Sequence, residues 1–386
     1  MLSMITQNTK DELKKQHYII VGEHSAVKIC GWTKNMIKGF GSCYKFKFYG
    51  IRSNQCMQMT TSLSCANRCI FCWRGYSAPV SKEWTYSIDN PEIILKDSLL
   101  AQKKLLEGFG GQKKLKNLFE QSKTVKHVAL SLTGEPITYP KINELIELFN
   151  KEEISTFMVT NAQYPEEIKN LSRVTQLYLS IDAPTKELLK KIDAPLFNDY
   201  WERMNKSLAY CSKKEDRTCI RLTLIKQLND IMPEEYAKLI KIGNPDFIEV
   251  KAYMHIGASR TRLKVDQMPW HEEVMKFTQS LIKYLPDYEI VTEHVPSRVV
   301  MCAKKKFKKN GKWYTWIDFE KWHKLIKSKK TFTKYDFLKR TPQTDLSGRN
   351  IQKEVEEKIK KKLIDKKNSQ DKKNNIIDET TEMELQ

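Results

Sequence analysis

The chain has 386 residues, 40% of them hydrophobic, and carries 67 Lys plus Arg against 47 Asp plus Glu, a net charge of +20. This length allows one large domain or two of ordinary size. The positive excess favours a polyanionic partner such as nucleic acid, the alternative being a lysine-rich surface that serves only solubility. No run of about 18 apolar residues occurs and residues 1–15 are polar, which argues against a membrane span and a secretory signal, so we expect a cytoplasmic protein with reduced thiols.

Strands and helices are predicted to alternate along most of the chain. The first 75 residues are rich in cysteine and are predicted to form strands, most clearly at residues 43–49. Further strands are predicted at residues 127–132, 156–160, 176–181, 218–225 and 247–252, and helices at residues 91–106, 142–150, 186–191, 199–211, 233–241 and 272–285. This alternation predicts an α/β fold, a partial or full TIM-like βα barrel, with its active residues following the strands.

Changes in composition divide the chain into four parts. We expect an N-terminal extension at residues 1–56, the barrel at 57–303, a basic and aromatic C-terminal extension at 304–350, and a charged, disordered tail at 351–386. Lysines alternate with aromatic side chains in the C-terminal extension, a pattern that suits phosphates and unpaired bases. The alternative is that the aromatic side chains dock this segment onto the barrel.

Six of the nine cysteines lie between residues 30 and 72, and clustered thiols in a reduced compartment more often bind metal than form disulfides. Cys65, Cys69 and Cys72 have the spacing C-x3-C-x2-C, which can hold three irons of a [4Fe–4S] cluster and leave the fourth iron open. A structural zinc usually takes four ligands, and no fourth Cys or His follows nearby. The spacing, with Phe71 before the last cysteine, resembles the radical S-adenosylmethionine superfamily.

That resemblance implies that the open iron binds S-adenosylmethionine, whose cleavage gives a 5′-deoxyadenosyl radical that removes hydrogen from a substrate. Gly134 and Glu135, in a Thr-Gly-Glu-Pro segment after a predicted strand, would then grip the methionine amino group. The other candidate cofactor contacts are Phe71 in the loop, Asn161, Ser180 and Asp182 for the ribose, and Lys251 and Tyr253 for the adenine. The last five are equally well explained as ordinary polar residues at strand ends.

A second set of three cysteines, Cys30, Cys43 and Cys56, precedes the first and suggests a second cluster with a vacant iron; three ordinary buried thiols are the alternative. In an extended strand Cys43 and Lys45 would share a face. A lysine beside such a cluster could capture a keto acid as a Schiff base, although most lysines in a chain this basic lie on the surface.

Both cysteine sets, with Cys-Tyr-Lys-Phe-Lys-Phe-Tyr-Gly at residues 43–50, together resemble the archaeal-type tRNA 4-demethylwyosine synthase family over about residues 20–322. The resemblance implies two [4Fe–4S] clusters and S-adenosylmethionine as cofactors. It implies the radical condensation of N1-methylguanosine at position 37 of tRNA(Phe) with pyruvate, held at Lys45, to a tricyclic imidazopurine. We also expect a monomer and a separate electron donor such as ferredoxin or flavodoxin, since no flavodoxin-like pattern is found.

Basic and aromatic residues after the barrel strands are the candidate contacts to tRNA: Arg260, Arg262, Arg298, Lys304, Lys305, Lys306, Trp313 and Trp316. Two other functions remain open at this point. One is a different radical enzyme with an auxiliary cluster that acts on RNA or peptide. The other is a non-catalytic, metal-bearing RNA-binding protein.

Overall fold

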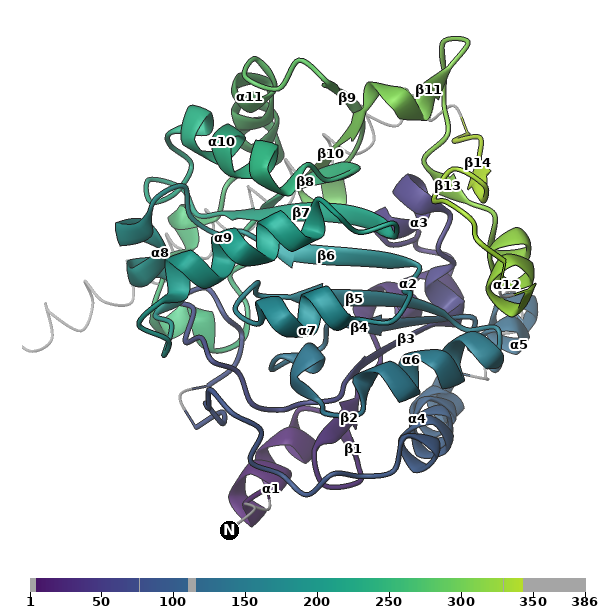
Figure 1. Ribbon diagram of the computed structural model, residues 1–386. Helices are drawn as coiled ribbons and strands as arrows, with labels where there is room; N and C mark the ends of the chain where they lie inside the picture. The colour runs from purple at the N-terminus through teal and green to yellow at the C-terminus, as the bar shows by residue number, and fades with distance from the viewer. Residues whose placement is uncertain (1–4, 76, 110–115, 329, 343–386) are drawn as a thin grey trace, which may run out of the picture. The chain divides into compact units, whose positions relative to one another are not determined.

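The computed structural model describes residues 5–75, 77–109, 116–328 and 330–342, and the described residues up to Pro342 belong to one compact unit. The predicted tail at 351–386 lies outside the described residues. A sheet of 10 strands forms the centre of this unit (Figure 1). In their order across the sheet, the strands are β1 (Ile19–Val21), β2 (Ser25–Val27), β3 (Cys56–Thr60), β4 (His127–Leu130), β5 (Ser155–Thr160), β6 (Gln176–Ser180), β7 (Arg217–Leu224), β8 (Phe247–Ala252), β10 (Val299–Lys304) and β9 (Tyr288–His294).

The six central strands, β3 to β8, pair in parallel and in chain order. At one side β2 pairs antiparallel with β3 and β1 with β2, and at the other β10 pairs antiparallel with β8 and β9 with β10. Strands β1 and β9 are the two edges, so the sheet is an open, partial barrel. The predicted α/β class is confirmed, and the carboxyl ends of the parallel strands face one rim.

Helices cover the outer face of this sheet (Figure 1). They are α4 (Pro91–Leu106), α6 (Ile142–Lys151), α7 (Pro165–Asn170), α8 (Lys186–Asp193), α9 (Tyr200–Cys211), α10 (Pro233–Gly243) and α11 (His271–Ile282), with α1 (Gln7–Lys15) before the first strand and α5 (Lys116–Ser122) between α4 and β4. Local signals set their ends: at α4, Asn90 accepts the N–H of Glu92 through its side chain at 2.8 Å, and Pro91 occupies the first turn.

The strand predicted at residues 43–49 is wrong. After α2 (Gly31–Ile37), this segment forms the helix α3 (Tyr44–Tyr49), which Cys43 precedes and Gly50 ends at φ 81°. Tyr44 and Phe48, four residues apart, are both buried, as one face of a helix requires. The aromatic residues that suggested a strand therefore pack as one face of a helix. Gly50 then supplies the left-handed residue that ends this helix.

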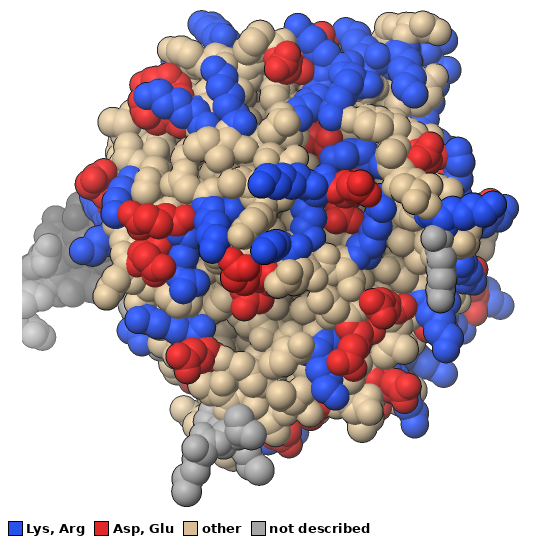
Figure 2. Space-filling model, in the orientation of Figure 1, with Lys and Arg blue, Asp and Glu red and all other residues tan. Residues whose placement is uncertain are grey.

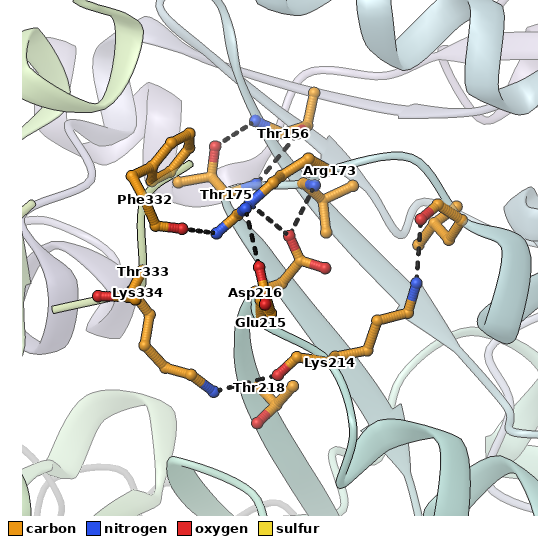
Figure 3. A network of polar contacts seen from close by, with 12 residues as sticks. Thr156, Arg173, Thr175, Lys214, Glu215, Asp216, Thr218, Phe332, Thr333 and Lys334 are labelled. Carbon is orange, nitrogen blue, oxygen red and sulfur yellow. Dashed lines mark hydrogen bonds and ion pairs between the residues drawn. The ribbon is translucent and has the colours of Figure 1, made fainter. Parts of the chain in front are cut away.

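Residues 304–328 and 330–342 close the side of the barrel where the parallel strands begin. This segment contains β11 (Lys308–Lys309), β12 (Lys312–Trp313), β13 (Trp316–Ile317), α12 (Phe319–Ser328) and β14 (Leu338–Lys339). Arg173, just before β6, donates to the Phe332 carbonyl at 2.9 Å, and its guanidinium lies 4.1 Å from the centre of the Phe332 ring (Figure 3). Lys334 reaches Asp246, just before β8, at 2.7 Å. Trp322 is fully buried, so aromatic side chains do dock this segment.

Lysine and arginine side chains gather over the β11 region on the face seen in Figure 2, whereas acidic and basic side chains mix over the helices below. Among the described residues, no helix is both long enough and apolar enough to cross a membrane.

Candidate radical and auxiliary metal sites

The loop with Cys65, Cys69 and Cys72 follows β3 and is braced by the end of α8. The backbone N–H groups of Arg68 and Ile70 donate to the carbonyls of Asp193 and Ile192, each at 2.8 Å. The Asn67 amide adds a bond to the Asp193 carboxylate at 3.2 Å. The protein itself therefore holds the backbone of this loop in place.

Arg262, predicted as a tRNA contact, also braces this loop. Its Nε donates to the carbonyl of Ile70 at 3.1 Å, and its Nη2 donates to the carbonyls of Arg74, at 3.0 Å, and Cys72. A planar guanidinium suits such a fan of carbonyls, because its donors point in fixed directions. Arg262 thus stabilises the conformation of the cysteine loop.

The three thiols of this loop fit an iron–sulfur cluster by their donor chemistry. All three cysteines are free and only partly exposed, and burial raises the pKa of the Cys65 thiol to about 12. A bound cluster reverses that effect, since thiols bind iron as thiolates. Among the residues that the structure describes, no group of three or more His, Cys, Asp or Glu is arranged to hold a single metal ion. The fit therefore rests on three soft donors in one braced loop.

Glu135 presents an unbonded carboxylate oxygen beside that loop. Its Oε2 accepts the N–H of Asn161 at 3.0 Å, whereas its buried Oε1 has no partner among the described residues. Burial raises the pKa of Glu135 to about 7. Gly134 holds this position at φ 64°, where a Cβ would lie 2.0 Å from the carbonyl oxygen of Ser62. The orphaned oxygen suits an ammonium group, as the family motif implies.

The other predicted ribose contacts lie on the same rim. The Asn161 amide reaches the sulfur of Cys65 at 3.5 Å, so Asn161 adjoins the cysteine loop. Ser180 ends β6, and the buried Asp182 follows it and accepts the N–H of Thr223 at 3.2 Å. Phe71 is partly buried against the main core.

The second cysteine set opens onto a cavity of about 440 Å³. Cys30 immediately precedes α2, Cys43 precedes α3, and Cys56 begins β3, yet all three line the same cavity. The N–H of Cys43 donates to the hydroxyl of Ser53 at 2.9 Å. All three are free cysteines. The fold thus gathers, from three elements, the soft donors that a second cluster requires.

Lys45, in the first turn of α3, lines the same cavity. Its Nζ lies 4.7 Å from the ring centre of Tyr178 and 5.8 Å from that of Phe157. Burial, followed by the nearby cation of Arg221, lowers the pKa of Lys45. A lowered pKa favours the neutral amine, which is the form that attacks a ketone carbon.

Lys251 and Tyr253, predicted together as adenine contacts, have separate surroundings. Lys251 lines the cavity of the second cysteine set, and burial lowers its pKa to about 8. Tyr253 is buried, and its hydroxyl bonds with Ser259 at 3.0 Å and with His255 at 2.9 Å. The structure therefore associates Lys251 with Lys45.

Comparison with known proteins identifies the family. Residues 59–240 match the model of the radical SAM superfamily, and residues 242–304 match the model of wyosine base formation. A structure of TYW1 with a lysine–pyruvate adduct bound is 35% identical, with a TM-score of 0.72, and the match covers 80% of this chain and 99% of that chain. The chain belongs to the TYW1 family.

Other TYW1 proteins match over similar lengths. The crystal structure of an archaeal TYW1 is 31% identical, with a TM-score of 0.65, and the match covers 80% of this chain and 99% of that chain. The S-adenosyl-L-methionine-dependent tRNA 4-demethylwyosine synthases TYW1 of Xenopus laevis and Homo sapiens are each 48% identical, over 89% and 90% of this chain and 48% of each relative. The chain spans about half the length of the curated TYW1 relatives that it matches.

Two of the tRNA contacts predicted for this TYW1 family member are buried. Arg298 is 5% exposed; its guanidinium donates to the carbonyl of Pro269 at 3.0 Å and lies 4.0 Å from the centre of the Trp270 ring. Lys304 is 8% exposed and donates to the carbonyl of Asn244 at 2.7 Å. These donors are engaged inside the protein, which disfavours phosphate contacts for them.

The remaining candidates divide between packing and surface. Trp316 is half-buried against α3, and Trp313 is half-buried with Lys308 5.4 Å from its ring centre. Arg260, Lys305 and Lys306 are exposed, and Lys306 lies 3.6 Å from Asp246. These three cations remain the strongest candidates for a polyanion.

Sequence reasoning missed Arg221 and Glu249, which pair across β7 and β8 inside the barrel. Arg221 Nε reaches Glu249 Oε2 at 3.2 Å, and the Tyr49 hydroxyl donates to Glu249 Oε1 at 2.9 Å. The available signal was the presence of charged residues within two neighbouring, largely buried strands of a TYW1 barrel: Arg217 and Arg221 in β7, and Glu249 and Lys251 in β8. A charge at such a position is rare unless it is paired or functional.

Proposed function

We propose that this protein is an S-adenosylmethionine-dependent tRNA 4-demethylwyosine synthase, which condenses N1-methylguanosine at position 37 of tRNA(Phe) with pyruvate. One observation carries the proposal. Lys45 shares a cavity with Cys30, Cys43 and Cys56, while a separate braced loop carries three more cysteines. Two donor sets of this kind suit two small reactants, S-adenosylmethionine and pyruvate. Membership of the TYW1 family supports this assignment.

The first donor set would hold the cofactor. Cys65, Cys69 and Cys72 would bind a [4Fe–4S] cluster, and the free oxygen of Glu135 would accept the ammonium of S-adenosylmethionine. When bound, that cofactor supplies the radical that removes hydrogen from the N1-methyl group. Asn161 donates hydrogen bonds to both Glu135 and Cys65, and so fixes the position of the carboxylate relative to the cysteine loop.

The second donor set would hold pyruvate beside a second [4Fe–4S] cluster. The neutral amine of Lys45 attacks the ketone carbon, a C–N bond forms, and water leaves to give an imine. The relative with a lysine–pyruvate adduct supports this role for a lysine. Desolvation of Lys45 lowers its pKa and so favours the neutral amine.

The remaining partners follow from charge and chemistry. A net charge of +20 suits tRNA, and it also suits an acidic, separate electron donor such as ferredoxin or flavodoxin. We propose that the protein works in the cytoplasm as a monomer, which size-exclusion chromatography and cell fractionation can test. The target guanine must leave its stack to reach a buried radical.

The test uses protein that is purified and reconstituted without oxygen. We expect about eight irons and eight sulfides per chain, cleavage of S-adenosylmethionine on reduction, and a tricyclic nucleoside, seen by mass spectrometry, from methylated tRNA plus pyruvate. Lys45→Ala should lose the tricyclic product while cofactor cleavage is still detected, whereas Cys69→Ala should lose both. Zinc in place of iron, with no cleavage, would instead identify a non-catalytic RNA-binding protein. Cleavage with no product from pyruvate would indicate another radical reaction.

A further inference from the structure

Arg221 leaves one edge of its guanidinium unused in the wall of the second cavity. The residue stands opposite Glu249 in the register of β7 and β8, and its Nε is bonded to that carboxylate at 3.2 Å. Its Nη2 is buried and has no hydrogen-bond partner within the described ranges. Proteins seldom leave a buried donor unbonded, because its lost hydration is not replaced.

The cavity also contains more positive than negative side chains. Lys45, Arg221 and Lys251 line it, and its lining includes no Asp or Glu. Glu249 lies behind Arg221 and balances only one of these cations. Buried charges require partners, so the cavity is built to receive anions, of which the thiolates of a bound cluster would be one source.

The side chains of Lys45 and Arg221 both lie against the ring of Tyr178. The Nζ of Lys45 lies 4.7 Å from the ring centre of Tyr178, and the guanidinium carbon of Arg221 lies 4.9 Å from it. In a 2-oxo acid the carboxylate is attached directly to the carbonyl carbon. A small molecule captured at Lys45 would therefore carry its negative charge toward the neighbouring cations.

We propose that Arg221, whose side chain lines this cavity and is 16% exposed, binds the carboxylate of the 2-oxo acid whose carbonyl carbon Lys45 captures. This assignment rests on the proposed function and adds the residue that selects an acid over a neutral ketone. Lys251 is the competing holder of the carboxylate, because its Nζ makes one long bond of 3.4 Å to the carbonyl of Ala252. Arginine is favoured, since its planar donors match a carboxylate.

Reductive trapping tests the assignment without turnover. Anaerobically reconstituted protein is incubated with cyanoborohydride and increasing pyruvate, or methyl pyruvate, which keeps the ketone but lacks the charge. Intact-mass spectrometry then measures the reduced adduct. Arg221→Gln should raise the half-saturating pyruvate concentration about 10- to 100-fold, and should change that of methyl pyruvate less than about threefold. Arg221→Lys keeps the charge, so its half-saturating pyruvate concentration should lie between those of the unmodified protein and Arg221→Gln. This variant replaces Arg221→Gln in the test if the glutamine variant does not fold.

Two comparisons make the result decisive. Arg217 is a buried arginine of the same strand; it donates to the Thr315 carbonyl and does not line the cavity. In Arg217→Gln the ratio of the half-saturating concentrations of pyruvate and methyl pyruvate should therefore not change. Equal loss of pyruvate and ester in Arg221→Gln, no loss of either, or loss of the preference only in Lys251→Gln would each overturn the assignment. No adduct in the unmodified protein would overturn the capture by Lys45 itself, and with it the proposed function.

Discussion

The indole nitrogen of Trp316 donates a hydrogen bond to the backbone carbonyl of Lys47 at 3.0 Å. The same ring packs 5.4 Å from Phe46 and lies so close to Gly50 that a Cβ there would be 2.9 Å from it. The C-terminal segment thereby supports α3, the helix that carries Lys45.

Trp316→Ala should therefore loosen α3. We expect the free energy of unfolding to fall by about 2–4 kcal/mol, because a half-buried indole and its hydrogen bond are lost together. Urea unfolding measures this change, and reductive trapping of pyruvate should weaken in parallel. Trp313→Ala removes a half-buried indole outside α3 and is the matched control. If trapping weakens equally in both variants, the support that we assign to Trp316 is wrong.

Gly134→Ala should weaken the binding of S-adenosylmethionine about tenfold or more, since the new methyl group would meet the Ser62 carbonyl at 2.0 Å and a left-handed φ disfavours alanine. Equilibrium dialysis with the reconstituted protein measures the affinity. Gly311 also has a positive φ, of 72°, but no atom lies within 4 Å of its added Cβ. Gly311→Ala should thus bind the cofactor normally, and a similar loss in both variants would rule out a local clash.

Acid should weaken the docking of α12, because the ring of His127 lies 4.5 Å from that of Phe319 in α12 and His323 belongs to the same helix. Burial lowers the pKa of His127 to about 3 and that of His323 to about 4. Between these values and 6.5 the folded protein binds fewer protons than the unfolded chain, so stability is full above pH 6.5 and is lost as the pH falls. For His127 the loss is about 2 kcal/mol by about pH 5. Urea unfolding over this range should show a shallower decline in His127→Gln; parallel curves would contradict the prediction.

Arg262→Lys should impair cluster retention. Lysine cannot reach the carbonyls of Ile70, Cys72 and Arg74 with one planar group, so we expect about half of the bound iron to be lost on gel filtration. The exposed Arg260 supplies the control: Arg260→Lys should retain its iron. Full iron in Arg262→Lys together with weaker tRNA binding would restore the tRNA contact predicted from sequence.

Elements with local signals could be predicted, and α4 illustrates why. Asn90 and Pro91 define its start in the sequence itself, and the prediction matched the observed bounds. The segment at 43–49 failed because alternating aromatic residues suit either a half-buried strand or a short helix, and burial against the C-terminal segment decides between them. Gly50 was the local signal that favoured the helix.

The loop with Cys65, Cys69 and Cys72 could be predicted from spacing, because a cluster loop confines its ligands to a few residues. The role of Arg262 could not be found in this way, since its partners lie about 190 residues earlier in the chain. Arg298 and Lys304 were predicted to contact tRNA for the same reason, because the carbonyls that they bond are also distant in the sequence. Nothing in a basic stretch tells which cations face solvent and which meet a backbone carbonyl brought close only by folding.

Strand β3 begins at Cys56, a member of one cysteine set, and leads directly into the loop that starts the other at Cys65. It is pinned on both sides, by β2 and by β4. A pinned strand advances about 3.3 Å per residue and hardly stretches. If both cysteine sets hold clusters, as proposed, this strand would help to fix the distance between them, so inserting or deleting a residue in it should change that distance.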